Sequence, residues 1–221
     1  MNNNRTIRVT GRGRLKIRPD MTRIKITLEG VFWKYDETLR KSSEATEQMK
    51  NLLGEFGFQK SDLKTLNFEI DTEYESYKSE DTYKQRFVGY KYEHVMKVEF
   101  DSDNERLGKI LYALAHSPLH PEFRISYTVK DEDAAKNELL GKAVKDAKEK
   151  AVVLTRAAGV TLTEIQNIDY SWGEVTFESR PMDRMMMADV CCSASDRSYD
   201  LDIEPDDIDV SDTVTVIWGI Q

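Results

Sequence analysis

Three histidines are the residues of this chain best suited to metal binding or proton transfer. His116 and His120 stand four residues apart, a spacing that on a helix would present two imidazoles to one zinc ion. Pro118 lies between them and prevents a regular helix there, so we predict two exposed loop histidines and no metal site. His94 alternates with apolar residues, and we predict a hydrogen-bonded core or interface histidine rather than a general base.

Two further features could carry chemistry: two adjacent cysteines, through their thiols, and a pair of glycines, as part of a phosphate-binding loop. Cys191 and Cys192 stand in an acidic segment, which disfavours the reactive thiolate; a redox sensor is the weaker alternative. Gly11 and Gly13 lack the third glycine of a phosphate-binding loop and interrupt a strand pattern, so they indicate a bulge or a close backbone approach. We therefore expect no enzyme activity and no cofactor.

Basic side chains near the N-terminus are the strongest candidates for binding. Residues 1–25 contain eight Lys or Arg and one Asp, although the net charge of the chain is −8. The candidates on one face are Arg8, Arg12, Arg14, Lys16 and Arg18, with Arg23 and Lys25 across the Pro19-Asp20 turn. Such a stripe can hold phosphates, but it lacks interleaved aromatic residues for base stacking. We therefore favour pairing with acidic groups of the same chain or a neighbour over nucleic-acid binding.

An irregular acidic, Met-rich loop is expected at 178–209. Residues 178–212 contain eleven Asp or Glu and three Arg, so the two ends of the chain have opposite charge. The loop also contains Met182, Met185, Met186 and Met187. Flexible thioethers suit adaptable contact surfaces, and we interpret these methionines as interaction residues rather than as copper ligands.

Hydrophobic periodicity supplies the elements that would position these residues. Alternation predicts strands at 7–17, 24–32, 66–74, 90–100, 123–129, 164–172 and 210–220, with an extension at 175–177 left open. Helical spacing predicts helices at 36–56, 103–116 and 131–158, and the polar stretch 77–85 is interpreted as a hairpin tip. In the last helix a small-residue stripe would allow close packing; it consists of Ala135, Leu139, Ala143, Ala147 and Ala151.

These elements predict an α+β fold in the order β-β-α-β-β-α-β-α-β-β. We expect a mostly antiparallel sheet, or two sheets, packed on one face by about three helices, with an internal duplication left open. We treat residues 1–221 as a single domain. No apolar run approaches the ~20 residues of a membrane span, and the polar N-terminus has no apolar signal-peptide core, so we expect a cytoplasmic protein.

Short motifs in a fixed order resemble those of the SIMPL-domain family. They are Gly11-Arg-Gly13 through Pro19-Asp20, Asp62-Leu-Lys-Thr65 after Gly57, Gly89-Tyr90, the alanine stripe before Ala158-Gly159, Pro181-Met182 with Met187-Ala188, Ile203-Glu-Pro205 and the final strand. The family often has Pro-Gly before that strand, where this chain has Pro205-Asp206. The resemblance covers nearly the whole chain.

The resemblance implies an α+β fold, a tendency to form large oligomers such as channel-like rings, and links to envelope or oxidative stress. It implies no catalytic residues. Combined with the charge layout, it leads us to expect a non-enzymatic, self-associating scaffold or interaction protein. We expect this protein to form homo-oligomers, and we leave a protein partner open. The alternative hypothesis is an anion- or nucleic-acid-binding module that uses the basic face of the first strand.

Overall fold

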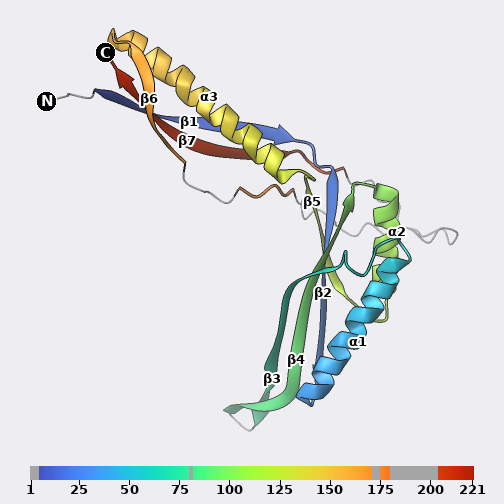
Figure 1. Cartoon of the computed structure of the whole chain (residues 1–221). Coiled ribbons are helices and arrows are strands. Elements are labelled where there is room, and N and C mark those ends of the chain that lie inside the picture. Colours follow the sequence, from blue (N-terminus) through green and yellow to red (C-terminus); the bar gives the residue numbers. More distant parts are fainter. Residues whose placement is uncertain (1–4, 80–81, 171–174, 180–203) are drawn as a thin grey trace. The chain divides into compact units, whose positions relative to one another are not determined.

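The computed structural model describes residues 5–79, 82–170, 175–179 and 204–221 (Figure 1). Its elements are β1 (Thr6–Ile17), β2 (Met21–Phe32), α1 (Tyr35–Gly54), β3 (Lys64–Ser79), β4 (Thr82–Asp101), α2 (Asn104–Ala115), β5 (Glu122–Thr128), α3 (Glu132–Ala158), β6 (Leu162–Asp169) and β7 (Ile208–Ile220). This is the predicted α+β order, with two antiparallel sheets.

The chain forms two compact units. The three-strand unit comprises Met1–Asp20, Thr128–Ser179 and Pro205–Gln221, and the four-strand unit is built on Met21–Tyr127. The single-domain organisation of 1–221 stays a prediction.

The sheet of the three-strand unit has the order β1-β7-β6 and is packed on one face by α3 (Figure 1). The β1–β7 register runs unbroken from Thr6 opposite Gly219 to Ile17 opposite Ile208. Along β1 buried and exposed residues alternate, as expected for a half-buried strand. Val9 and Leu15 face the core, and the basic side chains between them are exposed.

Close packing of α3 on β1 depends on small residues from both elements. The helix begins after Asp131, whose carboxylate accepts a hydrogen bond from the Ala134 N–H at 2.8 Å. It ends at Gly159, which takes the left-handed conformation, φ 70°. The predicted stripe of α3 is buried along its length, and a Cβ on Gly11 or Gly13 would overlap the α3 backbone. The glycine pair therefore marks a close backbone approach, one of the two predicted possibilities.

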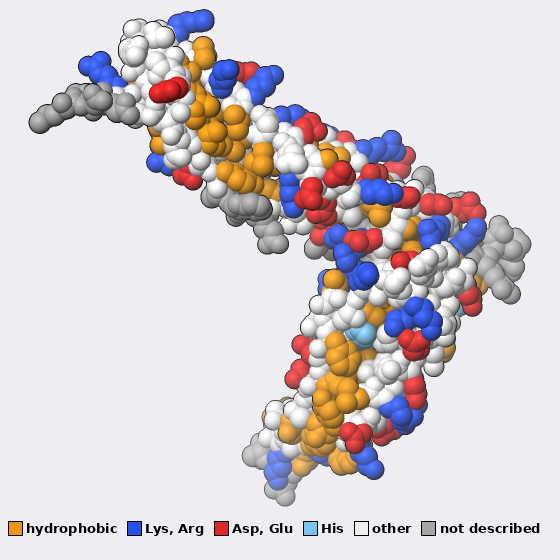
Figure 2. Space-filling view, in the orientation of Figure 1, with side chains coloured by type: hydrophobic (Ala, Val, Ile, Leu, Met, Phe, Trp, Pro, Cys, Tyr) orange, Lys and Arg blue, Asp and Glu red, His pale blue; other side chains and the backbone are white. Residues whose placement is uncertain are grey.

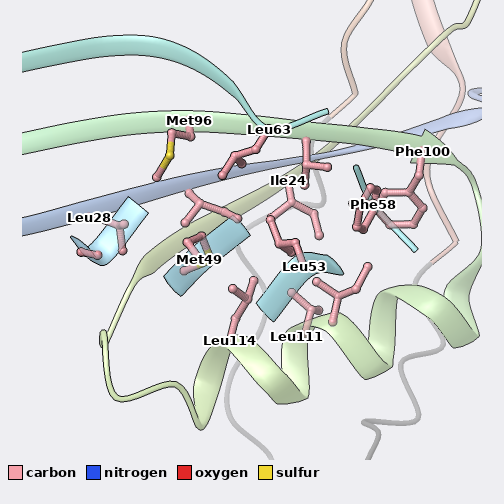
Figure 3. Close-up of a cluster of buried hydrophobic side chains, with 14 of the residues drawn as sticks. Ile24, Leu28, Met49, Leu53, Phe58, Leu63, Met96, Phe100, Leu111 and Leu114 are labelled. Carbon is pink, nitrogen blue, oxygen red and sulfur yellow. The ribbon is translucent and has the colours of Figure 1, made fainter. Parts of the chain in front are cut away.

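The sheet of the four-strand unit has the order β3-β4-β2-β5, with α1 and α2 packed on one face. Figure 3 shows the core between these layers: side chains from the strands, such as Ile24 and Met96, point toward Met49 and Leu53 of α1 and Leu114 of α2. Most of these side chains are less than 2% exposed. Asp103 caps α2 by accepting a hydrogen bond from the Arg106 N–H at 3.0 Å.

Strand boundaries differ most from the sequence prediction around the β3–β4 hairpin and after α3. β3 extends to Ser79 and β4 begins at Thr82, so the predicted hairpin tip at 77–85 was too wide. The polar arms pair because cross-strand partners compensate for their polarity; Arg86 donates to Glu75 at 2.7 Å.

The second difference concerns the segment after α3. β6 ends at Asp169, and Val175 and Phe177 do not extend it. Phe177 is instead a core residue of the three-strand unit, 2% exposed, and its carbonyl accepts a hydrogen bond from the Thr128 hydroxyl at 2.7 Å. β7 begins at Ile208, so the end of the expected 178–209 loop belongs to a strand.

Candidate interaction surfaces

The basic face of β1 lies on the side of its sheet that α3 does not cover. Its four cationic side chains, Arg8, Arg12, Arg14 and Lys16, are exposed, and so is Arg18, which follows the end of the strand. Arg8 forms an ion pair with Asp169 at 3.6 Å, and Lys16 one with Asp207 at 3.5 Å. Arg12 donates to the Ser211 hydroxyl at 2.8 Å. Pairing with acidic groups of the same chain is therefore confirmed for Arg8 and Lys16.

The free edge of β1 is covered at its centre by α3. The backbone N–H of Arg12 donates to the Asp146 carboxylate at 2.6 Å, and Lys150 lies 2.7 Å from the same carboxylate. The hydrogen bond from Lys150, followed by that from the Arg12 backbone, lowers the pKa of Asp146. Because edge strands that are covered cannot readily add another strand, this contact disfavours strand addition at the centre of β1.

Arg23 and Lys25 lie on a different sheet from the basic face of β1. They lie on β2, which pairs with β4, whereas β1 pairs with β7. Asp20 is held at this crossover: its N–H donates to the Thr128 carbonyl at 3.2 Å, and its carboxylate accepts from the Lys130 N–H at 2.8 Å. The Pro19-Asp20 turn joins two different sheets rather than closing a hairpin, and the expectation of seven neighbouring cations stays a prediction.

Arg23 is paired within its own sheet. It forms a hydrogen-bonded ion pair with Glu99, which also accepts a hydrogen bond from Lys97 at 3.0 Å. Burial opposes the charge of Glu99, but the hydrogen bonds from Arg23 and Lys97 prevail and lower its pKa. Lys25 is exposed, and no ion pair joins it to another described residue.

Met182, Met185, Met186 and Met187 lie outside the described residues, as do Cys191 and Cys192. Their proposed contact role stays a prediction.

His94 is a core histidine whose two ring nitrogens are hydrogen-bonded. It is 8% exposed, and the Thr46 and Thr65 hydroxyls lie 2.9 Å from Nδ1 and Nε2 respectively. The Thr46 hydroxyl also donates to the Ser42 carbonyl at 2.8 Å. Since a hydroxyl has one proton and a carbonyl only accepts, Thr46 accepts from Nδ1–H and Thr65 donates to Nε2. The prediction of a hydrogen-bonded core histidine is confirmed.

The surroundings of His94 favour its neutral form. Burial and then the nearby charge of Lys50 lower its pKa. The ring also packs edge-on against Phe68, with centroids 5.1 Å apart.

His116 and His120 are both exposed, as predicted. His116 stacks on Tyr112 at 4.1 Å between centroids and its Nδ1–H donates to the Tyr112 carbonyl at 2.8 Å. Within residues 5–79, 82–170, 175–179 and 204–221, no three His, Cys, Asp or Glu side chains are grouped to hold a metal ion.

An exposed aromatic cluster on the four-strand unit was not predicted from the sequence. Its members contact one another edge to face; they are Trp33, Tyr35, Tyr74, Phe87 and Tyr90. Trp33 is 63% exposed and Tyr74 is 52% exposed. Figure 2 shows hydrophobic side chains gathered over this part of the unit, where β3 and β4 pass α1. None of these five residues falls in the predicted hairpin tip at 77–85, and no local pattern in the sequence shows that they meet.

The fold and these surfaces define an α+β protein of two helix-covered antiparallel sheets that exposes charged and aromatic groups. The SIMPL family, described as a protein of unknown function (DUF541), matches residues 7–218, and the chain belongs to this family. No curated protein matches the sequence. In the part of the chain that the structure describes, no helix is long and apolar enough to cross a membrane.

Proposed function

We propose that this SIMPL-family protein is a self-associating scaffold or interaction protein rather than an enzyme. The observation that supports this most is the exposed aromatic cluster around Trp33 and Phe87. Aromatic residues are enriched at protein interfaces, and contiguous exposed apolar patches mark interaction sites. A link to stress, which the family resemblance implies, stays a prediction.

The rings of the aromatic cluster also pack against one another within the chain. Phe87 lies at its centre, with ring centroids 5.4 Å from Trp33, 5.6 Å from Tyr74 and 5.4 Å from Tyr90. Tyr35 extends it, 5.5 Å from Tyr90. Rings held by one another lose little conformational freedom on binding, which favours affinity.

Sedimentation velocity of the full chain over a wide concentration range tests this function. The double variant Trp33→Ser/Tyr74→Ser should weaken self-association about tenfold or more, because central aromatic residues dominate interface energy. Val153→Ser is the matched control, since Val153 is 66% exposed on α3 and remote in sequence from the cluster. A wild-type chain that stays monomeric at every concentration contradicts self-association.

Anion or nucleic-acid binding through β1 is the second candidate. Arg14 and Arg18 favour it, because both are exposed and neither makes an ion pair with another described residue. The test is binding of a fluorescent oligonucleotide at increasing salt. Phosphate contacts weaken steeply with salt, and Arg14→Gln/Arg18→Gln should reduce the affinity. Absence of binding at low salt excludes this candidate.

A further inference from the structure

The face of the four-stranded sheet that α1 and α2 leave uncovered has its charges arranged in rows across the strands. In the β2–β4–β3 register, Lys25 lies opposite Lys97, and Lys97 opposite Lys64. Two pleats further along, Glu29 lies opposite Glu93, and Glu93 opposite Glu69. A lysine row and a glutamate row therefore run side by side across the same three strands.

Within one chain these rows are unfavourable. Like charges directly opposite each other on neighbouring strands destabilise a sheet. Four of the side chains form no ion pair or hydrogen bond with another described residue: Lys25, Lys64, Glu69 and Glu93. The first three are exposed and Glu93 is half-buried. Charges of opposite sign supplied from outside the sheet would stabilise these four side chains.

The remaining members of the rows have partial compensation within the sheet. Lys91 contacts Glu29 at 2.7 Å, and Lys97 contacts Glu99 at 3.0 Å. The hydrogen bond with Glu29 raises the pKa of Lys91 despite partial desolvation. These pairs keep the charges of the central strand fixed in position.

The charge pattern is antisymmetric about the row between the lysines and the glutamates. That middle row is uncharged and consists of Thr27, Val95 and Asn67. Along the open face of β4 the sequence is Lys91, Glu93, Val95, Lys97, Glu99. Reversing this order exchanges every lysine for a glutamate and leaves Val95 in place.

We propose, resting on the proposed function of self-association, that a second copy of this chain docks face to face on this sheet. The two-fold axis would lie in the interface and run across the strands over Val95. Such an axis reverses the order of the rows, so each lysine row faces a glutamate row. The contact is isologous, as in most homodimers.

The two-fold arrangement brings together specific pairs of residues. On β2 Lys25 meets Glu29 of the second copy, and on β3 Lys64 meets Glu69 of the second copy. On β4 Lys97 meets Glu93, and Glu99 meets Lys91, each from the second copy. A single two-fold axis therefore places every lysine of these rows opposite a glutamate of the second copy on all three strands. A second copy alone is enough to pair both rows.

The size of the contact sets its strength. Lys25 and Glu29 are four residues apart, which corresponds to about 14 Å along a strand. An interface of this extent belongs to the small, weak class, and its exposed charges are screened by salt. The predicted dimer therefore forms at low ionic strength and dissociates as salt is added.

Two charge-reversal variants of the full chain test the proposal. Lys25→Glu/Lys64→Glu makes the face acidic, and Glu29→Lys/Glu69→Lys, which reverses the partners of these two lysines in the second copy, makes it basic. Each variant alone should lose the face-to-face contact, because like rows then meet. Mixed in equal amounts, the two should associate, because an acidic face then meets a basic one. Lys145→Glu/Lys148→Glu on α3 is the control, with the same charge change as the acidic variant outside the sheet.

Sedimentation velocity at low and high salt reads out the result, with far-UV circular dichroism to verify folding. Loss of self-association in each variant, recovery in the mixture and an unchanged control support the proposal. Unchanged association in both variants overturns it, while leaving the proposed self-association through another surface intact. Failure of the mixture to associate also overturns it. A wild-type chain that is monomeric throughout overturns both the contact and the proposed function.

Discussion

Gly11 of β1 lies against the backbone of Ala143 in α3, with no room for a methyl group between them. Gly13 has the same relationship to Leu139 one helical turn earlier. The helix can therefore approach β1 closely enough for Asp146 to bond the β1 backbone. Glycine at these two positions is a packing requirement, since both lie in a regular strand.

Gly11→Ala should destabilise the protein by about 1–3 kcal/mol, the usual cost of overpacking a core. The free energy of unfolding in urea, followed by circular dichroism, measures this. Gly141→Ala on α3, the helix that Gly11 faces, is the control, because a Cβ at Gly141 meets nothing within 4 Å. It should stabilise α3 by up to about 1 kcal/mol through helix propensity. Equal stability of Gly11→Ala and wild type would show that α3 moves away without cost.

Stability should fall as the pH drops below about 6.5, the ordinary pKa of an unfolded histidine. The pKa of His94 is lowered in the fold, so below 6.5 the unfolded chain binds a proton that the folded chain does not. Unfolding then becomes easier until the pH reaches the lowered value. Urea titrations from pH 7.5 to pH 5 measure the slope.

His94→Gln identifies the source of this pH dependence. Glutamine can hydrogen-bond Thr46 and Thr65 but does not titrate, so the variant should lose stability at pH 7.5 and show a flatter profile down to pH 5. An equally steep profile in the variant would assign the effect to other groups.

Alternation was enough to predict most strands and which face of each is buried. Val9 and Leu15 are buried while Arg12 between them is exposed, because a half-buried strand imposes a period of two on its sequence. Sheet partners were not predictable in this way. β1 and β2 each have one polar face and are joined by a Pro19-Asp20 turn, which suits a hairpin, yet β1 pairs with β7 at the far end of the sequence.

The candidate surfaces were predicted less well than the fold, for a related reason. The basic residues of β1 were found because they share one strand. The aromatic cluster combines residues from the β2–α1 turn, α1, β3 and β4, and the charged rows depend on the register of three strands. Both are set by long-range pairing, which a single sequence does not reveal.

Arg106 should add about 1 kcal/mol to the free energy of unfolding, because its guanidinium lies over the faces of two aromatic rings. Its guanidinium lies 4.2 Å from the Phe58 centroid and 5.1 Å from that of Phe100, and it donates to the Phe56 carbonyl at 2.9 Å. Arg106→Lys keeps the charge but loses the planar stacking, so the free energy of unfolding should fall by about this amount. Arg124→Lys, at an exposed position of β5, is the control and should change little. No difference between the two variants would exclude a stabilising ring contact.

Tyr127→Phe should raise stability by about 1 kcal/mol, since burying a hydroxyl without a partner costs free energy. The Tyr127 side chain is fully buried at the end of β5, and its hydroxyl has no hydrogen-bond partner among the described residues. Burial also raises its pKa, so ionisation above pH 10 should unfold the wild type more readily than the variant. Urea unfolding at pH 7.5 and at pH 10.5 measures both effects. A loss of stability in Tyr127→Phe at pH 7.5 would show that the hydroxyl is hydrogen-bonded in solution.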